Sequence, residues 1–370
     1  MRPARRVSIM SKRILVINPG STSTKIALFE GADKVFDETL RYTSEELSPF
    51  HWVMEQVDFR RTAIEKALAD YGIDMTTLDG ICARGGQLPA CESGTYLVDQ
   101  TIVDYMYTVK NAAHASNLGC VLAFQLAQPL KIPAFICDPV AVDEMVDEAR
   151  ITGLPEITRV MLGHALNCRA MARRCAEEIL HKPLEDCRLI VLHLGGGSSA
   201  RLFIGGRMVD GVRDDEWMFA PERMGGVSLQ PLVRLCYSGK YTEKQMMDFI
   251  RGKGGLVAHL GTSDAREVER RIADGDDHAK LVYDGMLYSA ARAVSALAAG
   301  ADGQVDRVIL TGGIAHSRYV ADYLTKKLSF IAPVEIMAGE FELEALAAGA
   351  CRVLEGQEHL KIFDRYEVQA

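Results

Sequence analysis

Residues 14–29 read ILVINPGSTSTKIALF: an apolar run, a short turn of small and hydroxyl-bearing residues, and a second apolar run. The same plan returns at residues 189–204, LIVLHLGGGSSARLFI, and Gly205 and Gly206 follow it. Apolar runs of this length favour buried strands, and the residues between them favour turns. Each copy therefore predicts a strand, turn, strand, turn and strand, and the repeat predicts two domains built alike.

Both turns have the composition of a phosphate-binding loop, because glycine lets backbone N–H groups approach oxygens closely and hydroxyls add short donors. The candidate phosphate or metal-shell residues are Asn18, Ser21, Ser23, Lys25, Gly195, Gly196 and Gly197. Neither turn is a P-loop or a dinucleotide fingerprint, since each joins two strands and opens no helix. An ordinary hairpin explains one copy alone, but two copies indicate a two-domain phosphotransferase that binds nucleotide.

The composition is that of an acidic globular protein. The 370 residues carry 42 Lys and Arg against 50 Asp and Glu, which gives a net charge of -8 and a pI near 5.7. No basic block stands out, which argues against nucleic acid as a partner. The nine cysteines include no C-x-x-C pair, so we expect reduced thiols and a cytoplasmic location. No apolar stretch suits a membrane span, and residues 1–13 carry several arginines but no apolar segment, so we do not expect them to act as a signal peptide.

Strand and helix patterns alternate along the chain, which predicts an α/β fold. Strands are expected at 13–18, 25–30, 34–40, 79–83, 134–137, 307–311 and 333–337 and in the second hairpin unit at 188–211. Helices are expected at 48–71, 100–111, 117–128, 164–181 and 341–355 and within 227–300. We expect a first domain of 13–150 with 352–370, a second of 151–351, and a disordered extension over 1–12.

Nine collinear stretches carry a resemblance to a known family. They are VINPGSTSTK, ARGG, HASNLG, CDPVAVDEM, HALN, HLGGGSSA, FAPERMGG, TGGIAHS and EFELEALAAGA. Together they span essentially the whole chain after residue 12, and they resemble the butyrate kinases, in the acetokinase branch of the actin-, hexokinase- and heat-shock-chaperone-like ATPase superfamily.

The resemblance implies two duplicated actin-like (ribonuclease H-like) domains with an active cleft between them. It also implies reversible, in-line phosphoryl transfer from ATP to a short-chain carboxylate, butyrate or a branched four- to five-carbon acid, to give an acyl phosphate and ADP. Mg²⁺ is the implied metal cofactor, and a homodimer or larger homo-oligomer is the implied assembly.

The chain departs from the family pattern at four places. The relatives usually have GRGGLL where residues 83–88 read ARGGQL, and an aromatic residue where Gly163 stands. Their DEGPFSPER corresponds to DEWMFAPER at 215–223, and their PGEDEMEAL to AGEFELEAL at 338–346. The polar atoms needed for chemistry are retained while the residues around them differ, so the reaction class is implied and the acyl specificity is open.

Phosphoryl transfer asks a protein mainly for positioning and charge neutralisation, and a carboxylate acceptor is already ionised. We therefore expect arginine, histidine and metal ligands and no strong base. Arg84, at a strand end before two glycines, is assigned to the substrate carboxylate or the transferring phosphoryl group through a bidentate fork. Arg223 is a second candidate, and a surface arginine in a turn is the alternative for each.

Three histidines are candidates for the site. His164 stands at a predicted helix start with Asn167 three residues on, and by resemblance it donates to the equatorial oxygens of the transition state. His193 occupies in the second turn the place of Asn18 in the first, and it is expected to hold nucleotide phosphates. His114 either contacts substrate or marks a loop. A buried or capping histidine is the alternative for the first two.

Magnesium prefers carboxylate oxygens together with water and phosphate. Asp138 at a strand end and Glu344 at a helix start are the predicted metal ligands. Glu340 and Glu342 compete with Glu344, and an acidic cluster there also suits the positive end of the helix dipole.

Two further stretches resemble the nucleotide-binding loops of the relatives. The predicted ATP or ADP contacts in them are Asp264, Arg266, Gly312, Gly313 and Ile314. A helix cap with a solvated side chain, and a tight strand-to-helix connection, are the alternatives.

Other functions remain open at this stage. An acetate or propionate kinase is the nearest alternative, because one methylene is worth only about 1–3 kcal/mol of discrimination in a pocket. A non-catalytic actin-like nucleotide switch is a second, against which Arg84, His164 and Asp138 argue. A chaperone-like ATPase is weaker, since no separate peptide-binding domain is visible.

Overall fold

The computed structural model describes residues 11–109 and 114–363, and the chain divides into two compact units. Unit 1 consists of Met1–Val142 with Phe341–Ala370, and unit 2 is Asp143–Glu340. The expected boundary at 351/352 falls inside the last helix, which packs as one element on the unit 1 sheet. The extension expected over 1–12 lies outside the described residues except for Ser11 and Lys12, and Lys12 forms an ion pair with Asp79 at 3.1 Å.

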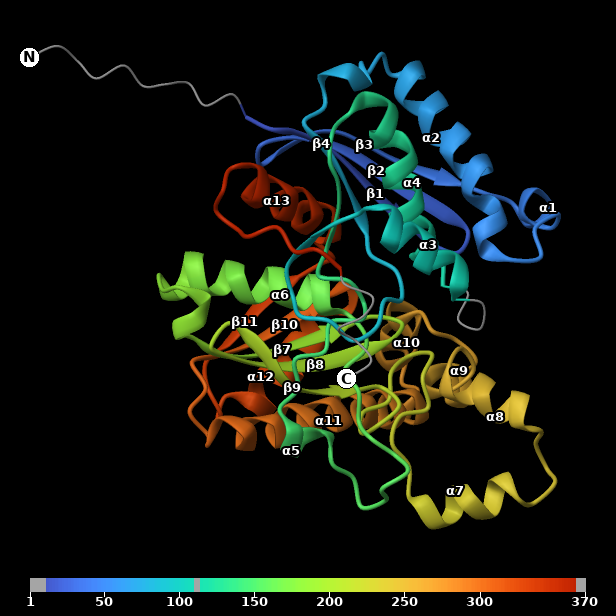
Figure 1. The fold of residues 1–370 in the computed structure, drawn as a ribbon. Helices are drawn as coiled ribbons and strands as arrows, with labels where there is room; N and C mark the ends of the chain where they lie inside the picture. The colour runs from blue at the N-terminus through green and yellow to red at the C-terminus, as the bar shows by residue number, and fades with distance from the viewer. Residues whose placement is uncertain (1–10, 110–113, 364–370) are drawn as a thin grey trace, which may run out of the picture. The chain divides into compact units, whose positions relative to one another are not determined.

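Unit 1 is built on a six-stranded sheet in the order β3-β2-β1-β4-β6-β5. Figure 1 labels β1, β2, β3 and β4 of this sheet. Its strands are β1 Arg13–Pro19, β2 Ser23–Glu30, β3 Asp33–Arg41, β4 Gly80–Arg84, β5 Thr95–Leu97 and β6 Ala134–Cys137. Its helices are α1 Ser44–Leu47, α2 Val57–Asp70, α3 Gln100–Thr108, α4 Asn117–Ala127 and α13 Glu342–Leu354. Successive side chains of a strand point to opposite faces of the sheet. Ile81 and Ala83 of β4 lie on the face that packs with α4. Cys137 of β6, whose partner in the sheet is Arg84, lies on the other face and contacts Gly349 of α13.

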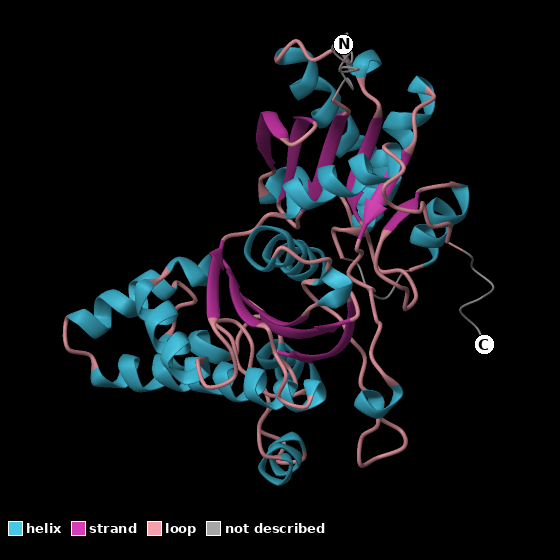
Figure 2. Ribbon diagram, turned by 90° about the vertical axis from the view of Figure 1, so that its left-hand side faces the viewer, coloured by secondary structure: helices cyan, strands magenta, loops and turns pink. Residues whose placement is uncertain are grey.

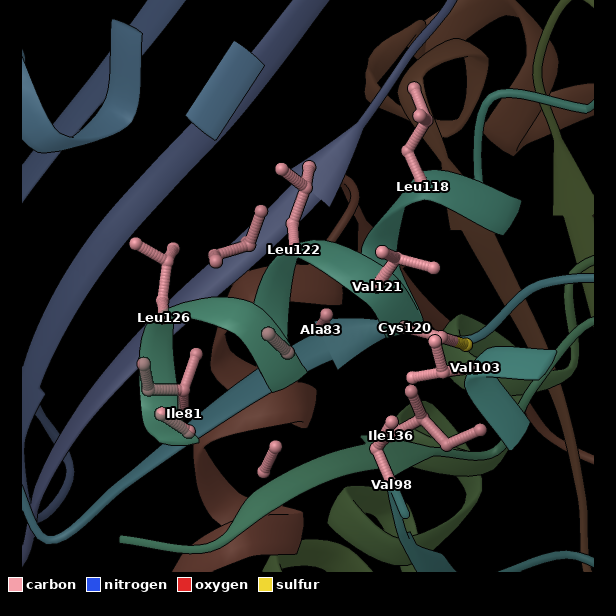
Figure 3. Close-up of a cluster of buried hydrophobic side chains, with 14 of the residues drawn as sticks. Ile81, Ala83, Val98, Val103, Leu118, Cys120, Val121, Leu122, Leu126 and Ile136 are labelled. Carbon is pink, nitrogen blue, oxygen red and sulfur yellow. The ribbon is translucent and has the colours of Figure 1, made fainter. Parts of the chain in front are cut away.

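The core of unit 1 lies between the sheet and α4. Figure 3 shows Leu118, Val121 and Leu122 of α4 gathered with Ile81 and Ala83 of β4, and all five are fully buried. Burial of apolar surface stabilises the folded state by about 25 cal/mol per Å². The packing of α4 therefore stabilises the sheet that carries the candidate residues.

Unit 2 is built on a five-stranded sheet in the order β11-β10-β7-β8-β9. Its strands are β7 Arg188–Leu194, β8 Ser198–Ile204, β9 Arg207–Arg213, β10 Arg307–Gly312 and β11 Val334–Ala338. Its helices are α5 Asp147–Arg150, α6 Ala165–Arg174, α7 Leu229–Cys236, α8 Glu243–Ile250, α9 Gly255–Leu260, α10 Ala265–Ala273, α11 Asp277–Leu297 and α12 Arg318–Leu328. Figure 2 draws the sheet of each unit in magenta and its helices in cyan.

The two sheets repeat one plan. The antiparallel meander β3-β2-β1 is followed by parallel β4 and β6, and β9-β8-β7 is followed by parallel β10 and β11. Even the irregularities correspond, because the middle strand shifts register at Leu28/Phe29 in one sheet and at Leu202/Phe203 in the other. The predicted α/β fold with a duplicated unit is confirmed.

Some predicted elements differ from the structure in their limits. The helix expected at 48–71 begins only at Val57, after a 3₁₀ turn at Val53–Gln56. The helix expected at 164–181 is α-helical to Arg174 and then continues as a π-helical turn. Of the helix expected at 100–111, the last two residues lie outside the described residues. Within the described chain, every helix is too short or too polar to cross a membrane.

Candidate functional site

Three polar residues follow the parallel strands of unit 1 at one edge of its sheet. β1 and β4 are parallel neighbours, as are β4 and β6, so their carboxyl ends meet at the same edge. Asn18 lies there near the end of β1, Arg84 ends β4, and Asp138 comes directly after β6. The sequence proposed each of the three separately, and the sheet brings them together.

Glu342, at the start of α13, completes this group. The Asn18 Nδ2 amide donates to Glu342 Oε2 at 2.6 Å, and Arg84 Nη1 donates to the same oxygen at 3.3 Å. Asn18 is buried, and the side chains of Arg84 and Glu342 are 23% and 14% exposed. One carboxylate oxygen is therefore held between an amide and a guanidinium that stand on neighbouring strands.

The other two acidic residues of this stretch have different surroundings. Glu344, which the sequence proposed as the metal ligand, forms an ion pair with Lys34 at 3.5 Å, and its side chain is 43% exposed. Glu340 is exposed and belongs to unit 2. The structure thus brings Glu342 to Asn18 and Arg84, and it leaves Glu344 at the surface.

Asp138 is held in an uncommon conformation. Its φ of 40° lies in the left-handed region, which aspartate tolerates better than most residues and which costs about 1–3 kcal/mol. Its Oδ1 accepts the Gly94 N–H at 2.8 Å, and the residue is 6% exposed. Residues with strained backbones are frequent at functional sites, and this supports Asp138 as a candidate site residue.

The remaining unit 1 candidates lie in the first turn, at the start of β2 and before α4. Ser21 and Lys25 are exposed and Ser23 is half-buried, so these three side chains are at least partly accessible from solvent. His114 is exposed, and its Nδ1 lies 2.7 Å from Ser116 Oγ at the start of α4. This contact joins His114 to the residue before the helix, and its contact with substrate stays a prediction.

In unit 2, Asn167 of α6 connects the ends of two parallel strands. Its Nδ2 lies 3.0 Å from Nδ1 of His193 on β7 and 3.2 Å from Oγ1 of Thr311 on β10. An amide that donates to Nδ1 leaves the ring proton on Nε2, a tautomer assigned from this hydrogen-bond network. His193 is 3% exposed, so its orientation is fixed by burial as well as by this bond.

His164 stacks on His193. Their ring centroids are 3.9 Å apart with an interplanar angle of 11°, and His164 Nδ1 lies 3.0 Å from Ser199 Oγ. Two charged rings at this distance would repel each other, so the stack favours a neutral ring in at least one position. The sequence proposed both histidines, and the structure places them in contact.

The backbone before His164 is held by a buried arginine that sequence reasoning missed. Arg201 of β8 is 1% exposed, and its Nη2 donates to the Leu162 carbonyl. Burial lowers the pKa of the Arg201 guanidinium. Gly163 has a φ of +132°, and a Cβ there would lie 2.9 Å from Arg201 Nη2. The family departure at Gly163 thus leaves room for this guanidinium.

The second turn is supported by Asp214 and flanked by Arg223. Asp214 Oδ2 accepts the Ser198 N–H at 2.7 Å and lies 3.9 Å from Arg223 Nε. Burial raises the pKa of Asp214, although these two neighbours act to lower it. A Cβ on Gly197 would lie 2.7 Å from Asp214 Oδ2, so the turn requires glycine there. The structure therefore brings Arg223 to the turn at 195–197.

A cavity of about 740 Å³ opens beside this turn, within the size range of small-ligand sites. Its lining includes Gly196 of the second turn and four residues of the two later stretches predicted to contact nucleotide, namely Asp264, Arg266, Gly313 and Ile314, together with Glu269, His316 and Ser317. Asp264 also caps α10 and pairs with Arg266 at 2.9 Å, as the helix-cap alternative predicts, and their contact with nucleotide stays a prediction. Gly312 ends β10 with a φ of 89° and pairs with Gly339.

Comparison with solved structures shows that the chain has the fold of the carboxylate kinases. It superimposes on acetate kinase from Porphyromonas gingivalis with a TM-score of 0.75 and 21% identity, covering 93% of this chain and 100% of that one. A propionate kinase from Francisella tularensis gives a TM-score of 0.73 at 16% identity, covering 91% and 98%.

Sequence comparison identifies the family. Residues 164–336 match the acetokinase family model. Butyrate kinase 2 of Clostridium acetobutylicum is 44% identical over 354 residues, which is 95% of this chain and 99% of that protein. A probable butyrate kinase 2 of Caldanaerobacter subterraneus is 45% identical over 95% and 99%. The chain belongs to the acetokinase family, whose members use ATP.

Proposed function

We propose that this protein is a carboxylate kinase that transfers the γ-phosphoryl group of ATP to a short-chain carboxylate, reversibly, to give an acyl phosphate and ADP. The observation that carries the proposal is the group formed by Arg84, Glu342 and Asn18 at the carboxyl ends of the unit 1 strands. Its residue types are those that phosphoryl transfer to an ionised acceptor requires, in a chain 44% identical to a butyrate kinase.

In the proposed reaction a carboxylate oxygen forms a bond to the γ-phosphorus while the bond from phosphorus to the bridging oxygen of ADP breaks. Arg84 holds the acceptor carboxylate or the transferring group through two parallel N–H donors. His164, supported by Ser199 and stacked on His193, donates to the equatorial oxygens as charge spreads over them. Arg223, beside the second turn, adds positive charge.

We propose Mg²⁺ as the metal cofactor, with Glu342 and Asp138 as its carboxylate ligands and Glu342 in the place first given to Glu344. The donor set fits this ion, which usually takes one or two protein carboxylates plus water and phosphate oxygens. Among the described residues no group of three or more His, Cys, Asp or Glu side chains is placed to hold a metal ion. When bound, the ion supplies charge neutralisation at the phosphates.

We assign nucleotide binding chiefly to unit 2. We assign its cavity to the adenosine portion of ATP or ADP, with Asp264, Arg266, Gly313 and Ile314 in its lining as contacts and Gly312 next to them. The second turn at 195–197 and the Nε2–H of His193 are assigned to the phosphates. Phosphate oxygens accept hydrogen bonds, and these groups can donate them. Asn18, Ser21, Ser23 and Lys25 of the first turn are assigned to the terminal phosphate.

We propose butyrate or a branched four- to five-carbon acid as the substrate, on the strength of the two Clostridium butyrate kinases, 44% and 41% identical to this chain. Acetate or propionate is the nearest alternative, because a single methylene changes binding by only about 1–3 kcal/mol. A homo-oligomer is the assembly we expect, and light scattering of the purified protein checks it.

The test is an acyl-phosphate trapping assay with hydroxylamine. Purified protein is incubated with Mg-ATP and acetate, propionate, butyrate, isobutyrate or valerate, and hydroxamate is measured. A signal that is largest at four or five carbons is the expected result, and a signal with acetate alone makes the protein an acetate kinase. ATP binding without hydroxamate from any acid overturns the proposal in favour of a nucleotide switch.

A further inference from the structure

Arg60, on α2, is completely buried directly beneath the first turn. Its Nη1 donates to the carbonyl oxygens of Gly20 and Ser23 at 2.8 and 2.9 Å, and its Nη2 donates to that of Ser21 at 2.9 Å. Further bonds reach the Thr24 hydroxyl at 3.1 Å and the Gln56 side chain at 2.8 and 3.0 Å. Six contacts thus use all five N–H donors of the guanidinium.

The charge of Arg60 is buried among neutral groups. Every acceptor bonded to it in the described residues is a carbonyl, amide or hydroxyl oxygen, and its Cζ lies 4.7 Å from the centre of the Tyr42 ring. A buried arginine is usually paired with a carboxylate, because burial of an unpaired charge is costly. Burial accordingly lowers the pKa of the Arg60 guanidinium. A cation held in this way has a positive field that no carboxylate among its bonded partners neutralises.

The bonds also set the direction of the peptide groups of the turn. In a trans peptide unit the C=O and N–H point in opposite directions. Since the carbonyls of Gly20 and Ser21 point at Arg60, the N–H groups of Ser21 and Thr22 point away from α2, on the side where both residues are exposed. The guanidinium therefore turns two backbone donors outward, as a phosphate-binding turn requires.

We infer that Arg60 is a positioning residue of phosphoryl transfer, which fixes the first turn in its phosphate-binding form and supplies buried positive charge beneath it. The inference rests on the function proposed above. Because Arg60 acts on the turn assigned to the terminal phosphate, its removal lowers turnover and leaves ADP binding by the unit 2 cavity unchanged. Lysine, with three donors on a single nitrogen, replaces it only in part.

The experiment compares Arg60→Gln and Arg60→Lys with two controls on the same helix. Arg61→Gln removes the same charge from an exposed pair with Asp58, and Ile64→Ala weakens packing one turn further along α2 without removing a donor to the turn. The measurements are kcat and KM in the hydroxamate assay, ADP affinity by calorimetry, melting temperature, and amide exchange of the peptide covering 19–25.

We expect kcat to fall at least thirtyfold in Arg60→Gln and less in Arg60→Lys, with ADP affinity within threefold of the parent and faster exchange at 19–25. Ile64→Ala, at a similar loss of melting temperature, keeps kcat within threefold. Equal kcat losses in Ile64→Ala and Arg60→Gln overturn the inference, as does a folded Arg60→Lys whose kcat and exchange match the parent. If the parent itself makes no acyl phosphate, the proposed function fails, and unchanged exchange at 19–25 in Arg60→Gln overturns the positional claim separately.

Discussion

Glu342 and Glu344 are two residues apart on α13, yet their carboxylates have unlike partners. Glu342 accepts from Asn18 and Arg84, whereas Glu344 pairs with Lys34 near the surface. Exposed ion pairs of the second kind contribute about 0–1 kcal/mol. The two residues therefore form a matched pair with which the metal assignment can be tested.

Glu342→Gln is expected to lower kcat on the order of 100-fold, similar to the loss caused by removing one preorganised electrostatic contact from an active site. The variant should also need more Mg²⁺ for half-maximal rate. Glu344→Gln should behave like the parent. Magnesium titrations of both variants in the hydroxamate assay test which glutamate is the ligand. A large effect in Glu344→Gln with none in Glu342→Gln would restore Glu344 as the ligand.

The sequence proposed Glu344 as a metal ligand with Glu340 and Glu342 as competitors, and it did not indicate that Glu342 is the one that contacts Asn18 and Arg84. Asn18 and Glu342 are separated by 324 positions, and no local pattern states which side of α13 faces β1. An acidic cluster at a helix start also has a local explanation in the helix dipole. Asn18, Arg84 and Asp138 were easier to find, because each follows a buried strand, which is itself a local signal.

Gly163→Ala tests the backbone before His164. The added Cβ meets Arg201 Nη2 at 2.9 Å, and the φ of +132° disfavours any side chain, so we expect a loss of about 1–3 kcal/mol in unfolding free energy. Turnover should fall too, since His164 is displaced. Gly153→Ala is the control, because nothing lies within 4 Å of a Cβ there. Urea unfolding measures the loss of stability, and kcat measures the loss of turnover. Equal unfolding free energies and equal kcat values in Gly163→Ala and Gly153→Ala would refute the role given to Gly163.

At the scale of elements, the segment before α6 is held to α5 by Asp143. The side chain is 3% exposed, and it accepts from Arg150 at 2.8 Å and from the Met161 N–H at 3.0 Å. Burial raises the pKa of Asp143, but these hydrogen bonds outweigh it and hold the pKa below its usual 3.8. Because the folded pKa is lowered, the stabilisation is complete above the ordinary pKa and is lost as pH falls through the folded value.

Asp143→Asn should therefore cost about 1–3 kcal/mol at neutral pH, the range for hydrogen bonds to a charged group. The difference from the parent should shrink as pH falls below 3.8, where the parent protonates. Urea midpoints from pH 7 down to pH 2 measure this, with the exposed Asp147→Asn as control. A difference that is constant across this range would contradict the titration of Asp143.

The hairpin units were predictable because strand and turn signals are local and occur twice. β5 was not, since three residues show no period and its pairing with β6 is long-range. α12 was overlooked although Val320, Leu324 and Leu328 carry the helical spacing and are buried. The buried arginines lay beyond sequence reasoning, because nothing local distinguishes the buried Arg60 from the partly exposed Arg61.

At the scale of the whole molecule, the candidate groups are divided between the units. Arg84 stands in unit 1, and the cavity with Asp264 and Arg266 is formed within unit 2. Arg84→Ala is expected to lower kcat by about 10²–10³ while ADP affinity stays within a factor of about two. Calorimetry with ADP and the hydroxamate assay check the two halves of this statement, with Arg266→Ala as the reciprocal variant. Loss of ADP binding in Arg84→Ala would contradict it.

The division of the chain also has a consequence for its synthesis. The helix that covers one face of the unit 1 sheet, and that carries Glu342, is separated from the rest of that unit by all of unit 2. At about 5–20 residues per second, the ribosome needs about 10–40 s to pass from residue 142 to residue 341. Throughout that interval the nascent sheet lacks α13 while unit 2 emerges as one uninterrupted stretch. The domain translated first is thus the last to be completed, and the growing chain exposes an apolar sheet face to chaperones or aggregation until its final helix leaves the exit tunnel.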